Sequence, residues 1–262
     1  MKRIKLTVSY DGTNYVGWQV QKNGIAIEQV LNEHLSTLLG EDIKVIGASR
    51  TDSGVHALGN IAVFDTETRI PSTKISLALN QSLPDDIKIA KSEEVDPDFH
   101  PRHADCTKTY RYSILNCRYN MPVMRLYTDY VYYPLDIEKM RKAAKYLLGE
   151  HDFTAFSTAG GQQKSPVRTI YSIDIDSTFL NPDADPKEDA EGGFRPVRID
   201  ITVKGNGFLY NMVRIIAGTL EKVGIGIYPP EYVEEILESR DRQLSAPKAS
   251  ARGLTLICID YL

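Results

Sequence analysis

The order of hydrophobic and polar positions predicts short strands interrupted by a few helices. Apolar residues recur at helical spacing over 27–39, 137–148 and 209–223, and the spacing predicts a further helix after Pro229-Pro230. Gly40 is suited to stop the first helix. Asp136 and Gly149 are suited to cap the two ends of the second.

Strand-like segments that alternate polar and apolar residues are typical of antiparallel sheets with one face covered by helices. They occur at 4–9, 43–47, 61–65, 110–115, 169–176, 197–203 and 254–260. The segments 4–64 and 109–216 share one order: a strand, a long helix ending in Leu-Leu-Gly, then more strands. We therefore predict an α+β fold of two similar halves, each a mainly antiparallel sheet flanked by helices. The N-terminal half would span 1–105 and the C-terminal half 106–262.

Composition narrows the class of protein. The chain has 262 residues, 42% of them hydrophobic and 25% charged, which excludes a disordered, collagen-like or coiled-coil protein. Three cysteines argue against a disulfide framework and favour a reducing compartment. The N-terminus has no signal-peptide core, and no apolar run has membrane length. We expect a cytoplasmic protein without a membrane partner.

The formal net charge of −4 argues at first against a nucleic-acid partner. However, residues 181–191 carry five acids and one base, so this segment alone accounts for −4. The surrounding stretch 181–193 has two prolines and no large apolar residue, and we predict an exposed acidic insertion between two strands. The rest of the chain is neutral, so RNA binding needs only that the basic residues gather on one face. The candidates are Arg50, Arg102, Lys108, Arg111 and Arg214.

Two segments have the residue types for chemistry. The loop 47–60 places Arg50, Asp52 and His56 among glycines, so a carboxylate there could face a pocket; the alternative is a structural Arg50–Asp52 pair. In the helix 209–223, Arg214 lies opposite the apolar stripe among small residues. This arrangement predicts a groove around Arg214 that another chain segment or a ligand could fill, and the alternative is a solvated arginine.

Other patterns are weaker. The segment 102–112 interleaves bases with Tyr110 and Tyr112, which could stack on a nucleobase or pack as ordinary strand residues. The turn 204–208 lacks the third glycine of a dinucleotide-binding loop. The set His100, His103, Cys106 and Cys117 has no usual zinc spacing, so no metal is predicted. No Ser or Cys stands in a nucleophile elbow.

Nine blocks in order give the sequence a close resemblance to the TruA-type tRNA pseudouridine synthases, across nearly the whole chain. They are Tyr10-Asp11-Gly12-Thr13 with Gly17-Trp18-Gln19, Arg50-Thr51-Asp52-Ser53-Gly54-Val55-His56-Ala57, Leu79-Asn80 with Leu83-Pro84, Phe99-His100, Lys108-Thr109-Tyr110-Arg111-Tyr112, Asp152-Phe153, Val167-Arg168-Thr169-Ile170, Gly207-Phe208-Leu209 with Met212-Val213-Arg214, and Gly253-Leu254. The second block is highly specific by itself.

The resemblance implies the pseudouridine-synthase fold and conversion of uridine to pseudouridine without a cofactor or metal. Asp52 matches the catalytic aspartate, which attacks C1′ or removes a ribose proton. Tyr110 matches the tyrosine that stacks on the uracil, and its phenol is a candidate relay for the C5 proton. Arg214 matches the arginine that pairs with the carboxylate, and the Asp52 loop would dock in its groove. Leu254 would wall the uracil pocket, and Arg50 is associated with displacing the target base.

The resemblance also implies a substrate, the anticodon stem-loop of tRNA at positions 38, 39 and 40, and a homodimer that holds each tRNA across both subunits. This sequence departs from the family pattern at the acidic insertion, at Thr255 and at His103-Ala104. Two other functions remain open on the residues alone. One is an RNA-binding protein of the same fold that has lost catalysis, and the other is a glycoside-cleaving enzyme that uses Asp52 with a second carboxylate.

Overall fold

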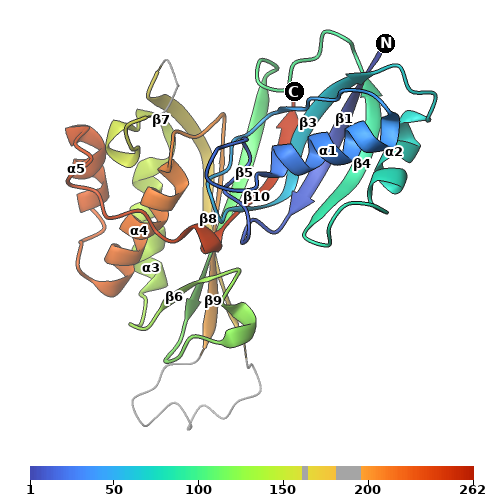
Figure 1. Cartoon of the computed structure of the whole chain (residues 1–262). Helices are drawn as coiled ribbons and strands as arrows, with labels where there is room; N and C mark the ends of the chain where they lie inside the picture. Colours follow the sequence, from blue (N-terminus) through green and yellow to red (C-terminus); the bar gives the residue numbers. More distant parts are fainter. Residues whose placement is uncertain (161–164, 181–195) are drawn as a thin grey trace. The chain divides into compact units, whose positions relative to one another are not determined.

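The computed structural model describes residues 1–160, 165–180 and 196–262, so the insertion predicted at 181–193 lies outside the described residues. The chain divides into two compact units (Figure 1). The first contains Met1–Thr107 and Thr255–Leu262, and the second contains Lys108–Leu254. The sequence pattern placed the last residues with the C-terminal half, 106–262. The structure groups them with the first unit, where the final strand pairs with a strand of the N-terminal sheet.

The first unit is a sheet with two helices. Its strands follow the order β4-β1-β3-β10, and the short strand β2 also pairs with β3. Their bounds are β1 (Lys2–Tyr10), β2 (Ile46–Gly47), β3 (His56–Thr66), β4 (Ile87–Val95) and β10 (Leu254–Tyr261). All pairs in this unit are antiparallel except β3 with β10. The helices α1 (Ile27–Leu39) and α2 (Ser72–Leu79) pack together beside the sheet (Figure 1).

The alternation along β1 explains how this sheet is covered. Ile4, Leu6 and Val8 are fully buried, whereas the residues between them are partly exposed, so one face of the strand packs in the core. The helix α1 ends as predicted at Gly40, whose φ of 68° is left-handed and whose N–H donates to Ser36 O.

The strand predicted at 43–47 is shorter in the structure. Only Ile46 and Gly47 pair with β3. The preceding backbone is bonded to side chains of α1, because Ile43 N donates to Ser36 Oγ and Val45 N donates to Asn32 Oδ1. Ile43 and Val45 are buried, so the apolar alternation was correct although the backbone pairing was not.

The second unit is a largely antiparallel sheet in the order β5-β9-β8-β7, with β6 added parallel to β5. The strands are β5 (Cys106–Asn116), β6 (Asp129–Val131), β7 (Gly149–Asp152), β8 (Val167–Phe179) and β9 (Val197–Gly205). The helices are α3 (Ile137–Ala144), α4 (Met212–Ile225) and α5 (Tyr232–Ser239), with short 3₁₀ turns at η1 (Pro122–Met124), η2 (Lys145–Leu147), η3 (Thr154–Phe156) and η4 (Ala251–Gly253). The three α-helices lie together on one side of this sheet (Figure 1).

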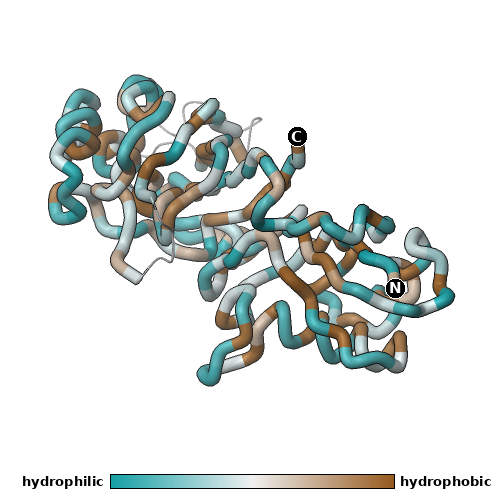
Figure 2. Tube along the Cα trace, turned by 90° about the horizontal axis from the view of Figure 1, so that it is seen from above, coloured by the Kyte–Doolittle hydropathy of each residue, from teal (hydrophilic) through white to brown (hydrophobic). Residues whose placement is uncertain are grey.

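Hydrophobic and hydrophilic stretches alternate along the trace of both units (Figure 2). Together the units confirm the predicted α+β class, with mostly antiparallel strands and flanking helices. No helix in the described ranges combines the length and the apolar composition that a membrane crossing needs.

The α3 helix shows one confirmed cap and one shortened end. Asp136 accepts a hydrogen bond from Lys139 N, as the sequence predicts for an N-cap. The α-helix stops at Ala144, and a 3₁₀ turn continues to Leu147 before the left-handed Gly149 (φ 96°) begins β7.

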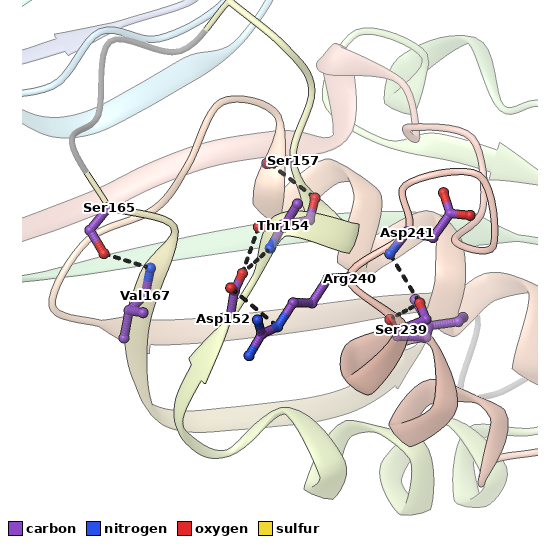
Figure 3. A network of polar contacts seen from close by, with 9 residues as sticks. Asp152, Thr154, Ser157, Ser165, Val167, Ser239, Arg240 and Asp241 are labelled. Carbon is purple, nitrogen blue, oxygen red and sulfur yellow. Dashed lines mark hydrogen bonds and ion pairs between the residues drawn. The ribbon is translucent and has the colours of Figure 1, made fainter.

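A polar network joins α5 to the end of β7 (Figure 3). The Asp152 carboxylate accepts from the N–H and the hydroxyl of Thr154, and Arg240 Nε lies 3.4 Å from its second oxygen. Burial alone would raise the pKa of Asp152, but the Thr154 hydrogen bonds and the charge of Arg240 outweigh it, so the pKa lies below the ordinary value.

Candidate active site

Asp52 lies on the loop between β2 and β3, and backbone hydrogen bonds fix this loop. The carbonyl of Thr51 accepts from Trp18 N at 3.1 Å, and the carbonyl of Asp52 accepts from Val55 N at 3.1 Å. Gly54 N donates to Tyr15 O at 3.3 Å. The Asp52 side chain is half-buried. The loop therefore presents this carboxylate from a backbone that is bonded on both sides of it.

Two glycines of the first sequence block explain how the loop is held so closely. Gly17 has a φ of 105°, and a Cβ there would lie 2.5 Å from Thr51 O. A Cβ at Gly12 would lie 2.0 Å from Val55 O. Both positions therefore require glycine for steric reasons. The segment from Tyr10 to Trp18 is thus a support for the Asp52 loop.

Buried side chains complete this support. Tyr10 Oη lies 2.7 Å from Thr51 Oγ1, and Asn60 Nδ2 donates both to Tyr10 Oη and to Ser49 O. The ring of His56 is buried with Nδ1 3.1 Å from Gly12 N. These contacts place the buried His56 ring in the support of the loop.

A basic cluster lies beside the loop in the same unit. Arg102 Nε donates to Gly47 O at 2.7 Å, and burial together with the charge of Arg50 lowers the pKa of Arg102. The rings of His100 and His103 are 4.1 Å apart, and burial and the neighbouring cations lower the pKa of His100. Arg50 itself is exposed. Cations held this close to one another favour binding of anions such as RNA phosphates.

In the second unit, Arg214 occupies the first turn of α4 and is only 9% exposed, so the alternative of a solvated arginine is wrong. Its Nε donates to Ala249 O at 2.8 Å, and its Nη1 donates to Asn211 Oδ1 at 3.1 Å. A Cβ at Gly218 would lie 2.4 Å from Pro247 O. The small residues on this face of α4 therefore lie against a segment of the same unit, and docking of the Asp52 loop there stays a prediction.

Asn211, at the start of α4, has the left-handed φ of 63°. Asparagine tolerates this conformation better than most residues, and such strain gathers at functional sites. Its side-chain amide donates to Thr158 Oγ1 while the oxygen accepts from Arg214. Asn211 therefore orients the guanidinium, a role that the sequence analysis missed. The available signal was its position on the Arg214 face of the helix.

Tyr110 and Leu254 are both buried at 7% exposure in the second unit. The Tyr110 ring packs edge-on against Phe208, with centroids 5.3 Å apart. Tyr112, two residues further along β5, projects from the same face of the strand. A Cβ at Gly253 would lie 2.7 Å from its ring, so Tyr112 packs against Gly253, the residue before Leu254.

Two acidic side chains lie close to Tyr112. Tyr112 Oη is 2.7 Å from Asp129 Oδ2, and burial and the Asp129 charge raise the pKa of the Tyr112 phenol. Burial and Asp129 also raise the pKa of Glu221. Of the two tyrosines that alternate with basic residues in 102–112, Tyr112 is therefore a buried structural residue of the strand. No pattern in the sequence indicated its partners, since Asp129 is 17 and Ser250 is 138 residues away along the chain.

The structure distributes the predicted site residues over the two units. Arg50 and Asp52 share one loop of the first unit, and Tyr110, Arg214 and Leu254 belong to the second. Among the residues that the structure describes, no group of three or more His, Cys, Asp or Glu side chains could hold a metal ion.

An apolar pocket of about 230 Å³ lies elsewhere in the second unit, lined by Asn116, Pro134, Leu135, Ile137, Phe179, Val197 and Ile199. The amide nitrogen of Asn116 already donates to Val131 O and Tyr133 O, and its oxygen accepts from Leu135 N. This pocket offers no acid or base and contains none of the predicted site residues.

Comparison with known proteins places these features in a family. The family model described as tRNA pseudouridine synthase matches residues 6–103 and 143–261. Over 261 residues, covering the whole of both chains, the sequence is 47% identical to tRNA pseudouridine synthase A of Ruminiclostridium cellulolyticum and 45% identical to that of Thermoanaerobacter sp. (strain X514). It is 44% identical over the same length to the protein of that name from Acetivibrio thermocellus.

Proposed function

This chain belongs to the tRNA pseudouridine synthase family and is an isomerase that converts uridine in tRNA to pseudouridine, and we propose that Asp52 is its catalytic carboxylate. The observation that supports this role is the loop itself. Its backbone is bonded on both sides of Asp52, and the glycines at positions 12 and 17 allow the supporting segment to contact it directly. A preorganised carboxylate is what a reaction at a sugar carbon needs.

The reaction breaks the C1′–N1 bond, rotates the uracil and joins C5 to C1′, after which C5 loses its proton and N1 holds one. An ionised carboxylate serves this chemistry by attacking C1′ or by removing a ribose proton, and it stabilises positive charge that develops on the sugar. The reaction needs no redox step, and we propose that it proceeds without a cofactor.

The other site residues have distinct proposed roles. Tyr110 stacks on the uracil and relays the C5 proton through its phenol. Arg214 pairs with the Asp52 carboxylate and keeps it ionised and oriented. Leu254 forms a wall of the uracil pocket. Arg50, which is exposed on the Asp52 loop, displaces the target base, a step that costs a few kcal/mol.

For the substrate, we propose the anticodon stem-loop of tRNA with targets at positions 38, 39 and 40. The cations Arg50 and Arg102 beside the Asp52 loop support an RNA phosphate contact.

We also propose that the protein acts in the cytoplasm as a homodimer, with each tRNA held across both subunits. Light scattering of the purified chain, alone and with tRNA, tests the dimer by a mass twice the 29.4 kDa of one chain.

The test of the activity is tritium release from tRNA transcripts labelled at C5 of uridine, with mass spectrometry of the product. We expect release of tritium from transcripts with uridine at positions 38, 39 or 40, and an RNA mass unchanged apart from the lost label. Tight binding without release would instead identify an RNA-binding protein that has lost catalysis. Free uracil or a cleaved sugar would identify a glycoside-cleaving enzyme.

A further inference from the structure

We propose that Tyr112 and Asp129 are positioning residues for Arg214, which they hold through the segment that carries its backbone acceptor. The proposal rests on the role proposed above for Arg214. It deepens that role by assigning a function to two side chains that contact each other and the backbone of Ser250, the residue after the Arg214 acceptor Ala249.

Two hydrogen bonds link Arg214 to Ala249. Arg214 Nε donates to Ala249 O at 2.8 Å, and Ala249 N donates to Arg214 O at 3.0 Å. Because one hydrogen bond joins the Arg214 side chain to Ala249 and another joins the two backbones, a shift of Ala249 changes the direction of the guanidinium.

The segment 245–250 runs along α4. A Cβ at Gly218, one turn after Arg214, would lie 2.4 Å from Pro247 O, so the segment reaches the helix backbone itself. At its start, Ser245 Oγ donates to Ala155 O and Ala246 N lies 3.4 Å from Thr219 Oγ1. The segment is thus fixed at its beginning and along its middle by groups other than Arg214.

Tyr112 and Asp129 contact the far end of the segment. Ser250 N donates to Asp129 Oδ2 at 3.1 Å, and Ser250 O lies 2.9 Å from Tyr112 Oη. The single phenol hydrogen of Tyr112 is shared between Ser250 O and Asp129 Oδ2, the latter at 2.7 Å. Both polar groups of the Ser250 backbone are therefore held by this pair, immediately after the residue that accepts from Arg214.

The substitution Tyr112→Phe tests this chain of contacts. It keeps the ring that packs against Gly253 and removes only the hydroxyl. We expect kcat to fall about 10-fold or more because a small misplacement of a catalytic group has effects of this size. The Kd for tRNA should stay within about threefold, because Tyr112 is fully buried.

A double-mutant cycle with Arg214→Lys separates positioning from general stability. Single-turnover rates are measured for wild type, both single variants and the double variant. If Tyr112 acts through Arg214, Tyr112→Phe should lower the rate by less than about twofold in the Arg214→Lys background. An equal loss in both backgrounds would overturn the proposal, as would a wild-type rate in Tyr112→Phe. A wild type that forms no pseudouridine would instead overturn the proposed function.

The matched control is Ser113→Ala, the next residue on β5, whose hydroxyl donates to the Asp200 carboxylate. It also removes one buried hydroxyl, but its contact has no connection to the segment 245–250. We expect its Tm to fall as much as that of Tyr112→Phe and its kcat to stay at the wild-type value.

A second pair of variants keeps the proposal testable if Tyr112→Phe does not fold. Asp129→Asn keeps an acceptor for Ser250 N, so it should retain several-fold more activity than Asp129→Ala. Equal, wild-type activity in that pair would also overturn the proposal.

Discussion

Replacing Asp52 by Asn changes one oxygen of a half-buried side chain and leaves the backbone bonds of its loop in place. We expect kcat to fall at least about 1,000-fold, because the amide can neither attack nor accept a proton, while the Kd for tRNA changes little. Tritium release under single-turnover conditions measures the first and filter binding the second. The control is Ser53→Ala on the same loop, for which we expect near-normal turnover. Wild-type turnover in Asp52→Asn would contradict the assignment.

Tyr110→Phe separates the two roles proposed for Tyr110. The ring and its edge-on contact with Phe208 are retained, so uracil stacking and folding should persist. The relay through the phenol is lost, and we expect kcat to fall about 100-fold or more with an unchanged Kd for tRNA. Turnover near that of the wild type would show that the hydroxyl is dispensable.

Asn211 combines a backbone role with a side-chain role, and two substitutions separate them. Both Asn211→Gly and Asn211→Ala remove the acceptor of Arg214 Nη1, so we expect kcat to fall about 10-fold in each. Only the alanine variant strains the backbone at a φ of 63°, so its free energy of unfolding should be about 1 kcal/mol lower than that of the glycine variant. Urea unfolding measures the difference. Unequal kcat values would point to the backbone as the determinant of activity.

At the scale of elements, sequence patterns predicted helices and strands with strong apolar periodicity and missed those without it. The helix at 27–39 has the predicted bounds because its apolar face and Gly40 agree. The strand β4 was missed because only Ile87, Ile89 and Ser92 are buried in it. The helix α2 has no side-chain hydrogen bond at its N-cap, Pro71, so its start has little signature in the sequence.

The residues of the candidate site also differ in whether local sequence patterns could predict them. Asp52 and Arg214 stood out because their local surroundings, glycines or small helix neighbours, are readable from adjacent residues. Asp129 could not be found, since its partner Ser250 lies 121 residues away along the chain. Contacts of this kind depend on the tertiary fold, which a pattern along the sequence does not contain.

The joint between β7 and α5 has a predictable pH dependence. The pKa of folded Asp152 lies below the ordinary value, so its carboxylate adds stability above an unfolded pKa of about 3.9 and loses it as the pH falls through the lower, folded pKa. We expect Asp152→Asn to lower the free energy of unfolding by about 1 kcal/mol at pH 7. This difference should shrink below about pH 4.

Urea titrations of both proteins at several pH values measure this effect. The control is Asp174→Asn, an exposed position on β8, which should stay within about 0.5 kcal/mol of wild type at every pH. A difference for Asp152→Asn that is constant with pH would show that the charge is not responsible.

At the scale of the whole molecule, the acidic insertion governs the overall charge. Leu180 N donates to Pro196 O, so a two-residue turn can replace residues 181–195. We expect a chain with Asn-Gly in their place to fold with an unchanged Tm. Its affinity for tRNA should equal or exceed that of the wild type, most clearly at low salt.

A second variant keeps the length of the insertion and changes its five acids, Asp183, Asp185, Glu188, Asp189 and Glu191, to their amides. If charge is responsible, this variant should bind tRNA as the shortened chain does. Weaker binding by the shortened chain alone would show instead that the insertion contacts RNA.

The place of β10 affects the synthesis of this protein on the ribosome. Thr255 and Leu256 pair with His56 and Ala57, so the first unit receives its last strand only after the second unit has been translated. Until then, the edge of β3 at His56 and Ala57, beyond its pairing with β2, is open for pairing with other chains. A nascent chain that stalls before residue 255 therefore carries an aggregation-prone edge, and such truncated products are natural targets for chaperones and proteases.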